Sequence, residues 1–319
     1  MAAAQFGIPI PQVFMQGVAD MTLIRDSLRR AEALGFHSAW VQDQVIGDVP
    51  LLESVTLMSY AAACTTRLKL GVSVIVFPVR NPVQLAKSVS SLDHMSGGRV
   101  ILGIGLGPPA NARNFYRSFG VEYSERVRRF NEGVAVMKSL WTQPVTRHDG
   151  EFWHLDGTAM EPKPLQKPHP PLWFGGQHRD ALRRAVRLSD GYMGAGPTTT
   201  REFAAHVHII REALSESGRD PATFPLSKRV YLAVDDDADR AKRRLDEFFG
   251  ARYPWMIRAN PTFVADICVW GPPRQCIDGL RTVIDAGAGM IVLNPLWDYV
   301  GQMERLAGDV LPHLQGAGQ

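Results

Sequence analysis

Two adjacent glycines, Gly175 and Gly176, follow a short apolar segment at residues 172–174 and precede a helical pattern. Backbone amides at such a turn can converge on an anion, and the amino end of the following helix favours negative charge. The side chains of Gln177 and His178 supply two further hydrogen-bond donors. These residues predict a binding site for a cofactor phosphate, and the alternative interpretation is an ordinary glycine-rich turn.

A carboxylate and an amide stand at the end of another apolar segment. Asp43 and Gln44 follow residues 37–42. A carboxylate in this position can accept a hydrogen bond from a heterocycle or accept a proton, and its alternative role is to cap the following loop or helix. We interpret both side chains as catalytic candidates.

A third candidate set is rich in glycine. Gly103, Gly105 and Gly107 lie at and beyond the end of an apolar segment at residues 99–104, where a cofactor can approach the backbone closely. Pro108 and Pro109 follow at once, which is a poor beginning for the phosphate-binding helix of a dinucleotide fold. We therefore reject a dinucleotide-binding fingerprint.

Eight predicted strands alternate with helices along the chain. The strands are expected at residues 6–10, 37–42, 68–77, 99–104, 172–174, 191–195, 228–234 and 290–293. The helices are expected at residues 21–34, 52–64, 82–95, 122–141, 178–188, 200–217, 238–249, 273–286 and 299–314. Eight such units favour an α/β fold of the (β/α)₈ TIM-barrel type over a doubly wound open sheet.

Barrel enzymes carry their chemistry at the carboxyl ends of the strands. That rule selects Asp43, Gln44, Arg80, Asn81, Gly105, Gly107, Gly175, Gly176, Gln177, His178, Ala195, Gly196 and Asn294. The proline-rich segment at residues 144–170 interrupts the alternation and contains a predicted hairpin. We interpret it as an insertion between the fourth helix and the fifth strand of a single domain covering residues 1–319.

Composition narrows the class of protein. A net charge of +3 with 21% charged residues gives no indication of a nucleic-acid partner, and 45% hydrophobic residues suffice for a large core. The three cysteines lack metal-ligand spacing, and His206 and His208 are a poor metal pair, so no metal site is predicted. No leader and no apolar run of membrane-spanning length is recognised, which predicts a cytoplasmic protein.

Three stretches of the chain resemble the bacterial luciferase-like family of flavin and deazaflavin oxidoreductases. They read ALGFHSAWVQDQ at residues 33–44, LGVSVIVFPVRNPVQLAKSVSSLDHMSGGRVILGIGLG at residues 70–107, and PLWFGGQHRDALRRAVRLSDGYMGAG at residues 171–196. The resemblance implies a TIM barrel that transfers hydride to or from a flavin-type cofactor. Among the members of the family, the sequences of these stretches are most similar to those of members that use coenzyme F420. FMN-dependent monooxygenation is the alternative, and a non-catalytic flavin or deazaflavin carrier is the second.

The resemblance also implies roles for particular residues. It places Asp43 beside the cofactor ring, with Gln44 where alcohol-oxidising members often have a histidine. It implies a cis peptide at Ser73-Val74 that contacts the ring. Pro108 stands near the position of a glutamate found in sugar-phosphate dehydrogenases, so that activity is not expected.

A homodimer is implied by the same resemblance, through the helices expected at residues 52–64 and 82–95. Small side chains on these helices would permit close packing: Ala61, Ala62, Ala63, Ser88, Ser90 and Ser91. The expected partner of the active site is a small-molecule substrate. Aromatic residues that could line its pocket are Phe14, Trp40, Phe77, Trp255 and Trp297, although each could equally belong to the core.

Overall fold

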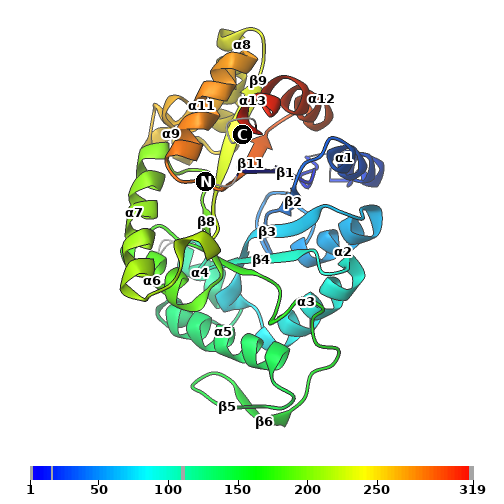
Figure 1. The fold of residues 1–319 in the computed structure, drawn as a ribbon, viewed down its shortest axis with the longest axis vertical. Coiled ribbons are helices and arrows are strands. Elements are labelled where there is room, and N and C mark those ends of the chain that lie inside the picture. Colours follow the sequence, from blue (N-terminus) through cyan, green and yellow to red (C-terminus); the bar gives the residue numbers. More distant parts are fainter. Residues whose placement is uncertain (1–2, 16, 109–111, 316–319) are drawn as a thin grey trace.

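Eight parallel strands close into a barrel in the computed structural model, which describes residues 3–15, 17–108 and 112–315. In barrel order the strands are β1 (Gln5–Pro9), β2 (Ser38–Val41), β3 (Lys69–Val76), β4 (Val100–Gly105), β7 (Leu172–Gly175), β8 (Gly191–Gly194), β9 (Leu226–Val234) and β11 (Met290–Pro295). The last strand, β11, pairs in parallel with β1 and closes the ring. The predicted (β/α)₈ fold is confirmed (Figure 1).

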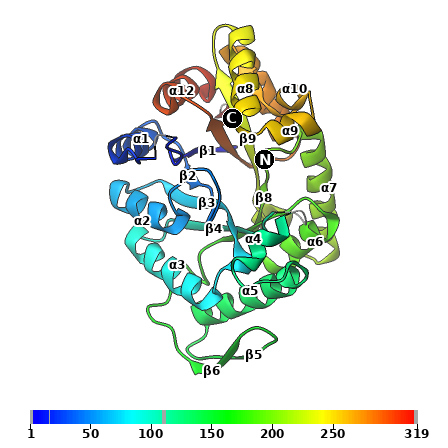
Figure 2. The ribbon, with the colours of Figure 1, turned by 180° about the vertical axis from the view of Figure 1, so that it is seen from behind.

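Helices surround the barrel, as both views show (Figures 1 and 2). They include α1 (Met21–Ala33), α2 (Ser54–Cys64), α3 (Pro82–Ser96), α5 (Arg126–Thr142), α6 (Arg179–Leu188), α7 (Thr200–Glu216), α8 (Ala238–Arg252), α11 (Pro273–Asp285) and α12 (Tyr299–Arg305). Helix α3 begins as the sequence predicts, because the Asn81 side chain accepts the amides of Val83 and Gln84 and Pro82 takes the first helical position.

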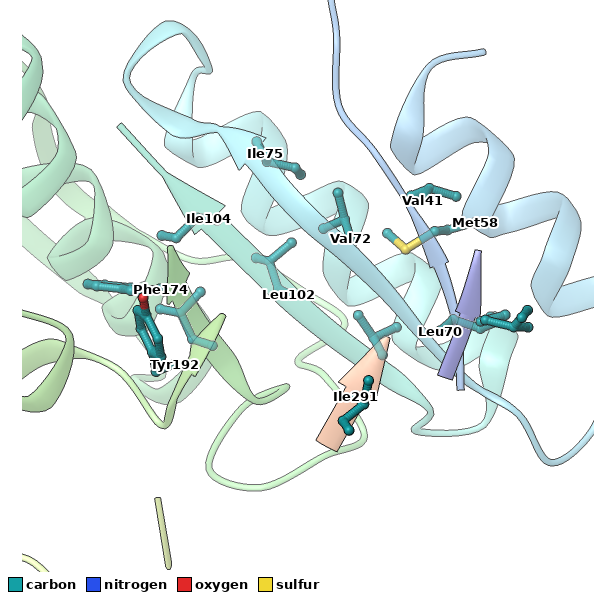
Figure 3. Packing of buried hydrophobic residues seen from close by; sticks show 14 of the residues in the cluster. Val41, Met58, Leu70, Val72, Ile75, Leu102, Ile104, Phe174, Tyr192 and Ile291 are labelled. Carbon is teal, nitrogen blue, oxygen red and sulfur yellow. The ribbon is translucent and has the colours of Figure 1, made fainter. Parts of the chain in front are cut away.

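The main core lies between the strands and the outer helices. Figure 3 shows part of it, with Leu70, Val72 and Ile75 along β3 and Leu102 and Ile104 along β4. All five side chains are buried. A parallel strand covered on its outer face by helices needs such a run of branched apolar residues.

A tryptophan fills the inside of the barrel. The Trp40 indole donates to Ser38 Oγ at 2.8 Å and lies 5.8 Å from the Trp173 ring, centroid to centroid. A Cβ atom added at Gly7 or Gly71 would fall within 2.5 Å of the Trp40 side chain. These two strand positions are therefore glycine because the indole occupies the space beside them.

Strand β3 is irregular near its carboxyl end. Its pairing with β4 shifts register between Val72 and Ile75, and the Ser73-Val74 peptide bond is cis, as the family resemblance implies. The shift turns the Val74 side chain toward the barrel interior, where it packs with the cluster around Trp40 and Trp173.

Several boundaries differ from expectation. The helix predicted at residues 122–141 begins at Arg126, after a 3₁₀ turn at Tyr123–Glu125. The helix predicted at residues 299–314 is interrupted: α12 gives way to a π-helical turn at Leu306–Val310 and then to α13 (Pro312–Gln315). Pro312 has no amide hydrogen to continue the regular pattern.

Four short elements were not predicted. They are α4 (Arg113–Arg117), α9 (Pro254–Ala259), α10 (Phe263–Ile267) and β10 (Val269–Gly271). Each is too short to show a hydrophobic period. The last three follow α8, and β10 pairs with the carboxyl half of β9.

The insertion contains the predicted hairpin, β5 (Thr146–Asp149) and β6 (His154–Thr158), which projects away from the barrel (Figures 1 and 2). The segment after it packs on α3, because Ser90 Oγ and Lys87 Nζ donate to the carbonyls of Pro162 and Glu161.

Three of the six small residues expected at a dimer surface on α2 and α3 are buried instead, while Ala63 and Ser88 are exposed. Ala61, Ala62 and Ser90 are buried within this chain, so they serve internal packing rather than a partner surface.

None of the helices in the described part of the chain is long and apolar enough to cross a membrane.

Candidate functional site

A cleft of about 750 Å³ opens at the carboxyl ends of β3, β4, β7, β8 and β9, and we call it the main cleft. Every residue predicted to bind a cofactor, apart from Asp43, lines it: Ser73, Val74, Gly105, Gly107, Gly175, Gly176, Gln177, His178, Ala195 and Gly196. Residues from separate strand ends are thus brought together, as the barrel rule requires.

The glycines of the main cleft leave room for protein side chains. A Cβ at Gly105 would lie 2.8 Å from Val74 Cγ2, and one at Gly175 would lie 3.3 Å from Val74 Cγ1. A Cβ at Gly196 would lie 2.7 Å from the Tyr231 ring. The sequence interpretation ascribed the glycines at the end of β4 to the approach of a cofactor. In the structure Gly105 accommodates the Val74 side chain, which forms the cleft wall.

One end of the main cleft is formed by the turn before α6. Helix α6 begins at Arg179 rather than His178, because His178 is its N-cap and Nδ1 accepts the Asp180 amide at 3.4 Å. The His178 side chain is 81% exposed. Gln177 Nε2 donates to Thr198 Oγ1 at 2.9 Å, and the Gly176 carbonyl accepts from the Tyr192 hydroxyl at 2.8 Å. The turn is therefore held firmly, with the helix amino end at the cleft.

Arginines gather at the same end. The Arg126 guanidinium stacks 3.6 Å from the Tyr123 ring centroid and donates to the Tyr123 carbonyl, and both residues line the cleft. The Arg113 guanidinium lies 5.9 Å from the centroid of the same Tyr123 ring. Arg126 forms no ion pair with the described residues. The basic run at residues 126–129 is the signal in the sequence that points to this end of the cleft, with a solvated helix face as the alternative interpretation.

The floor of the main cleft holds a buried cation. Arg229 is 6% exposed and donates one Nη2 hydrogen bond to the Ser73 carbonyl at 3.2 Å, and its Nε has no partner in the described part of the chain. No ion pair joins it to a described carboxylate, and burial lowers its pKa. Sequence analysis missed Arg229. Two consecutive cations within an apolar strand were the signal that could have found it, since buried charge without a partner is costly.

The neighbouring cation, Lys228, has a different environment. Its Nζ donates to the carbonyls of Ala195 and Arg229 at 3.0 and 3.1 Å, which ties the ends of β8 and β9 together. Burial lowers the pKa of Lys228 to about 8. Lys228 does not line the cleft and supports its wall through Ala195.

A second cavity, of about 250 Å³, lies at the ends of β1, β2, β9 and β11, and we call it the side cavity. Its walls are mostly apolar and aromatic: Ile10, Val13, Met15, Trp40, Val49, Leu51, Phe248, Tyr253, Leu296 and Tyr299. Tyr231 lines both the main cleft and the side cavity. The two spaces therefore meet at this side chain.

Two polar side chains that line the side cavity, Asn294 and Tyr231, lie side by side on paired strands. Asn294 is 4% exposed, and its Oδ1 has no partner among the described residues. The Tyr231 hydroxyl lies beside Gly196 of the main cleft, since a Cβ added at Gly196 would fall 2.8 Å from it, and burial raises the pKa of Tyr231 to about 12. Tyr231 therefore keeps its proton at neutral pH and can donate a hydrogen bond.

Asp43 also borders the side cavity, but its carboxylate is committed to the protein. The side chain is 1% exposed. It accepts from Arg80 at 2.6 Å, from the Val76 amide at 3.0 Å and from Ser54 Oγ at 3.0 Å. Gln44 borders the same cavity and donates to the Val49 carbonyl at 3.2 Å. Asp43 thus joins the ends of β2 and β3, and its catalytic role stays a prediction.

The remaining candidates are distributed differently. Arg80 pairs with Asp43, and Asn81 caps α3, so neither lines a cavity. Of the aromatic residues proposed for the substrate pocket, Trp40 lines the side cavity. The other four do not line it: Phe77 is buried in the core, Trp255 is 59% exposed, Trp297 stacks with Arg244, and Phe14 packs against the core.

The fold and site define a (β/α)₈ barrel with a ligand cleft at the carboxyl ends of its strands. Residues 5–289 match the family model of the luciferase-like monooxygenases. The chain belongs to this family.

Relatives within the family differ in cofactor. The chain is 27% identical over 254 residues to an FMNH₂-dependent dimethylsulfone monooxygenase of Pseudomonas putida, covering 78% of this chain and 68% of that protein. It is 29% identical over 228 residues to an F420-dependent glucose-6-phosphate dehydrogenase of Kineococcus radiotolerans, covering 68% and 66%. A structure of an F420-dependent secondary alcohol dehydrogenase superposes with a TM-score of 0.83 at 20% identity, covering 98% and 99%.

Proposed function

We propose that the chain is an oxidoreductase that exchanges hydride between coenzyme F420 in the main cleft and a small organic substrate in the side cavity. The observation that carries the proposal is Arg229, a buried cation that faces the cleft with an unpartnered Nε. A buried charge of this kind persists where a ligand completes its environment.

A flavin-type ring fits the floor of the main cleft. Its pyrimidine edge carries carbonyl oxygens and a ring nitrogen, and this edge becomes negative on reduction. Arg229 would hold that edge, while Val74 and Gly105 would form the wall beside the ring. When bound, F420 supplies a carbon centre that gives or accepts hydride.

The opposite end of the cleft fits the cofactor side chain. The α6 amino end and Arg126 would hold the phosphate. Arg113 and Arg184 add positive charge nearby. Arg113 lies against the same Tyr123 ring as Arg126. The pKa of Arg184 is lowered by burial, by Arg187 and, to a smaller extent, by Arg126, so Arg184 lies within electrostatic range of Arg126. The acidic side chain of F420 extends beyond its phosphate, which supports F420 over FMN.

Tyr231 and Asn294 would orient the substrate. Tyr231 meets both spaces and keeps its proton, so its hydroxyl can donate to a substrate oxygen or return a proton to it. Asn294 offers its unpaired amide oxygen, Oδ1, beside it. Asp43 acts in this proposal as a positioning residue, because its carboxylate anchors the Val76 amide at the end of β3.

FMN-dependent monooxygenation is the second candidate. The specific observation in its favour is that the FMNH₂-dependent relative covers more of this chain than the F420-dependent one does, at nearly the same identity. Arg229 and the phosphate site suit FMN as well.

Turnover of the loaded protein separates the candidates. Reduced F420 or reduced FMN is bound to the protein and mixed with a panel of aldehydes, ketones, imines and electron-poor alkenes, with and without oxygen. We expect oxidation of bound F420 by one substrate class without oxygen. Product formation only with FMN and oxygen would establish the monooxygenase, and tight cofactor binding without turnover of any compound would indicate a carrier.

A further inference from the structure

We infer that the side cavity recognises an anionic group, so that the substrate is a small organic acid with an apolar or aromatic body. The inference rests on the proposed function, because it takes the side cavity as the substrate site. It names a chemical class that the cavity walls alone do not suggest.

The anion-binding group is Arg252, near the end of α8. It is the one cationic side chain among the residues that line the side cavity in the described part of the chain. Nη1 lies 2.9 Å from the sulfur of Met15, a weak acceptor, and Nη2 is buried without a partner among the described residues. None of the ion pairs formed between described residues includes Arg252. Its hydrogen-bonding capacity is left for a ligand.

Asp43, the one acidic residue among the described residues that line the cavity, does not neutralise Arg252. The Asp43 carboxylate pairs with Arg80 at 2.6 Å and is 1% exposed. Its negative charge is therefore compensated on the side away from the cavity, and the space keeps the unpaired positive charge of Arg252. A guanidinium with free hydrogens matches a carboxylate, to which it can donate two parallel hydrogen bonds.

The rest of the cavity describes the body of the acid. Arg252 lies 5.8 Å from the centroid of the Tyr253 ring, and Phe248, Tyr299 and Trp40 also line the cavity. The volume of about 250 Å³ admits a small molecule only. Tyr231 lies where the side cavity meets the main cleft, so the reacting end of the substrate belongs there and the acid group belongs at Arg252.

Two probes of equal shape test the charge preference. Benzoate and benzamide are titrated by calorimetry into the full chain, loaded with F420 or FMN so that the main cleft is filled. We expect benzoate to bind at least about tenfold more tightly than benzamide. Arg252→Met should abolish this difference, and Arg252→Lys should retain part of it. Arg258→Met, which removes an exposed arginine from α9, is the matched control and should leave the preference intact.

Each outcome decides the inference. Equal binding of both probes, binding of neither, or an unchanged preference in Arg252→Met would overturn it. Arg252→Gln replaces the methionine variant if that variant melts early. Cofactor affinity is measured on every variant. Loss of the preference with unchanged cofactor binding supports the acid site, whereas failure of both F420 and FMN to bind the wild-type protein overturns the proposed function instead.

Discussion

Two buried charged side chains at the barrel mouth, Asp43 and Arg229, differ in how fully the protein satisfies their hydrogen bonds. Asp43 is surrounded by donors from three segments, and Arg229 has one carbonyl and an unpartnered nitrogen. Breaking a paired buried charge destabilises a fold, whereas replacing an unpaired one with an apolar side chain does not. We therefore assign Asp43 mainly to stability and Arg229 to ligand binding.

Substitution of Asp43 tests that division. Asp43→Asn removes the nearer and more deeply buried of the two carboxylates paired with Arg80, and we expect the free energy of unfolding to fall by about 2 kcal/mol in chemical denaturation. Glu53→Gln is the matched control, because Glu53 contacts the same guanidinium at 3.3 Å but is 38% exposed, and its cost should stay below about 1 kcal/mol. Normal stability of Asp43→Asn with lost turnover would instead make Asp43 catalytic.

At the scale of single residues, the sequence predicted candidate site residues wherever a motif marked the end of a strand. Gly175, Gly176 and Gln177 were found in this way, and all three line the main cleft. Arg229 and Tyr231 were missed because they lie within a strand, where alternation alone does not distinguish an inward side chain from a core residue. Their function depends on which groups other strands bring near them, and the local sequence around each residue does not contain that information.

Individual elements fit one another through glycines. The irregular end of β3 directs Val74 against β4 and β7, and Gly105 and Gly175 leave the space for it. Residues of three strands, β3, β4 and β7, therefore form the wall of the main cleft together. Such a contact is sensitive to a single methyl group.

A double-mutant cycle measures this fit. We expect Gly105→Ala to cost about 1–3 kcal/mol, since the new Cβ would lie 2.8 Å from Val74 Cγ2. Combining it with Val74→Ala should recover about 1 kcal/mol relative to the sum of the single changes. Gly250→Ala is the control, because nothing lies within 4 Å of its added Cβ within helix α8. Strict additivity of the two changes would refute the contact.

The tie between β8 and β9 predicts a pH dependence. The pKa of Lys228 is lowered from 10.5 to about 8, so the unfolded chain binds more protons than the folded protein between these values. The free energy of unfolding of the wild type relative to Lys228→Met should therefore rise with pH over that window, by on the order of 3 kcal/mol.

Denaturation curves at several pH values check the prediction. Lys242→Met, which removes an exposed lysine paired with Asp246, should follow the wild type throughout. A flat or falling difference for Lys228→Met would mean that the lysine is not buried as a charged group.

The elements that the sequence predicted well share long hydrophobic periods or clear caps. Helix α3 has Asn81, Pro82 and a closing Gly97 in the left-handed conformation, and its bounds differ from expectation by one residue. The elements after α8 are too short for a period and lie between prolines. Only packing against Phe249 and its neighbours determines them, as in the cluster that includes Phe263 and Val264.

At the scale of the whole molecule, the barrel mouth is divided between two spaces. The main cleft lies at the ends of β3 to β9, and the side cavity lies at those of β1, β2 and β11. Tyr231 lines both spaces. The alternating pattern was sufficient to predict the barrel, and hence the end at which the site lies. It could not predict the division, because loops and helix ends from distant parts of the chain form the walls.

Assembly is a separate prediction. We expect a homodimer through the exposed parts of α2 and α3, where Ala63 and Ser88 remain on the surface. The insertion already covers part of α3 through Ser90, which narrows the surface available to a partner. Light scattering at micromolar concentration should give twice the chain mass of 35.3 kDa. A monomer mass would contradict the prediction.

Equilibrium titration of F420 and FMN into the wild-type protein and Arg229→Met tests the central claim most directly. We predict micromolar or tighter binding of F420, with FMN weaker by at least about tenfold. Arg229→Met should lose about tenfold or more in F420 affinity while melting no earlier than the wild type, because it removes a buried, unpaired charge. Tighter binding of FMN than of F420, or an Arg229→Met variant that keeps full affinity, would contradict the account.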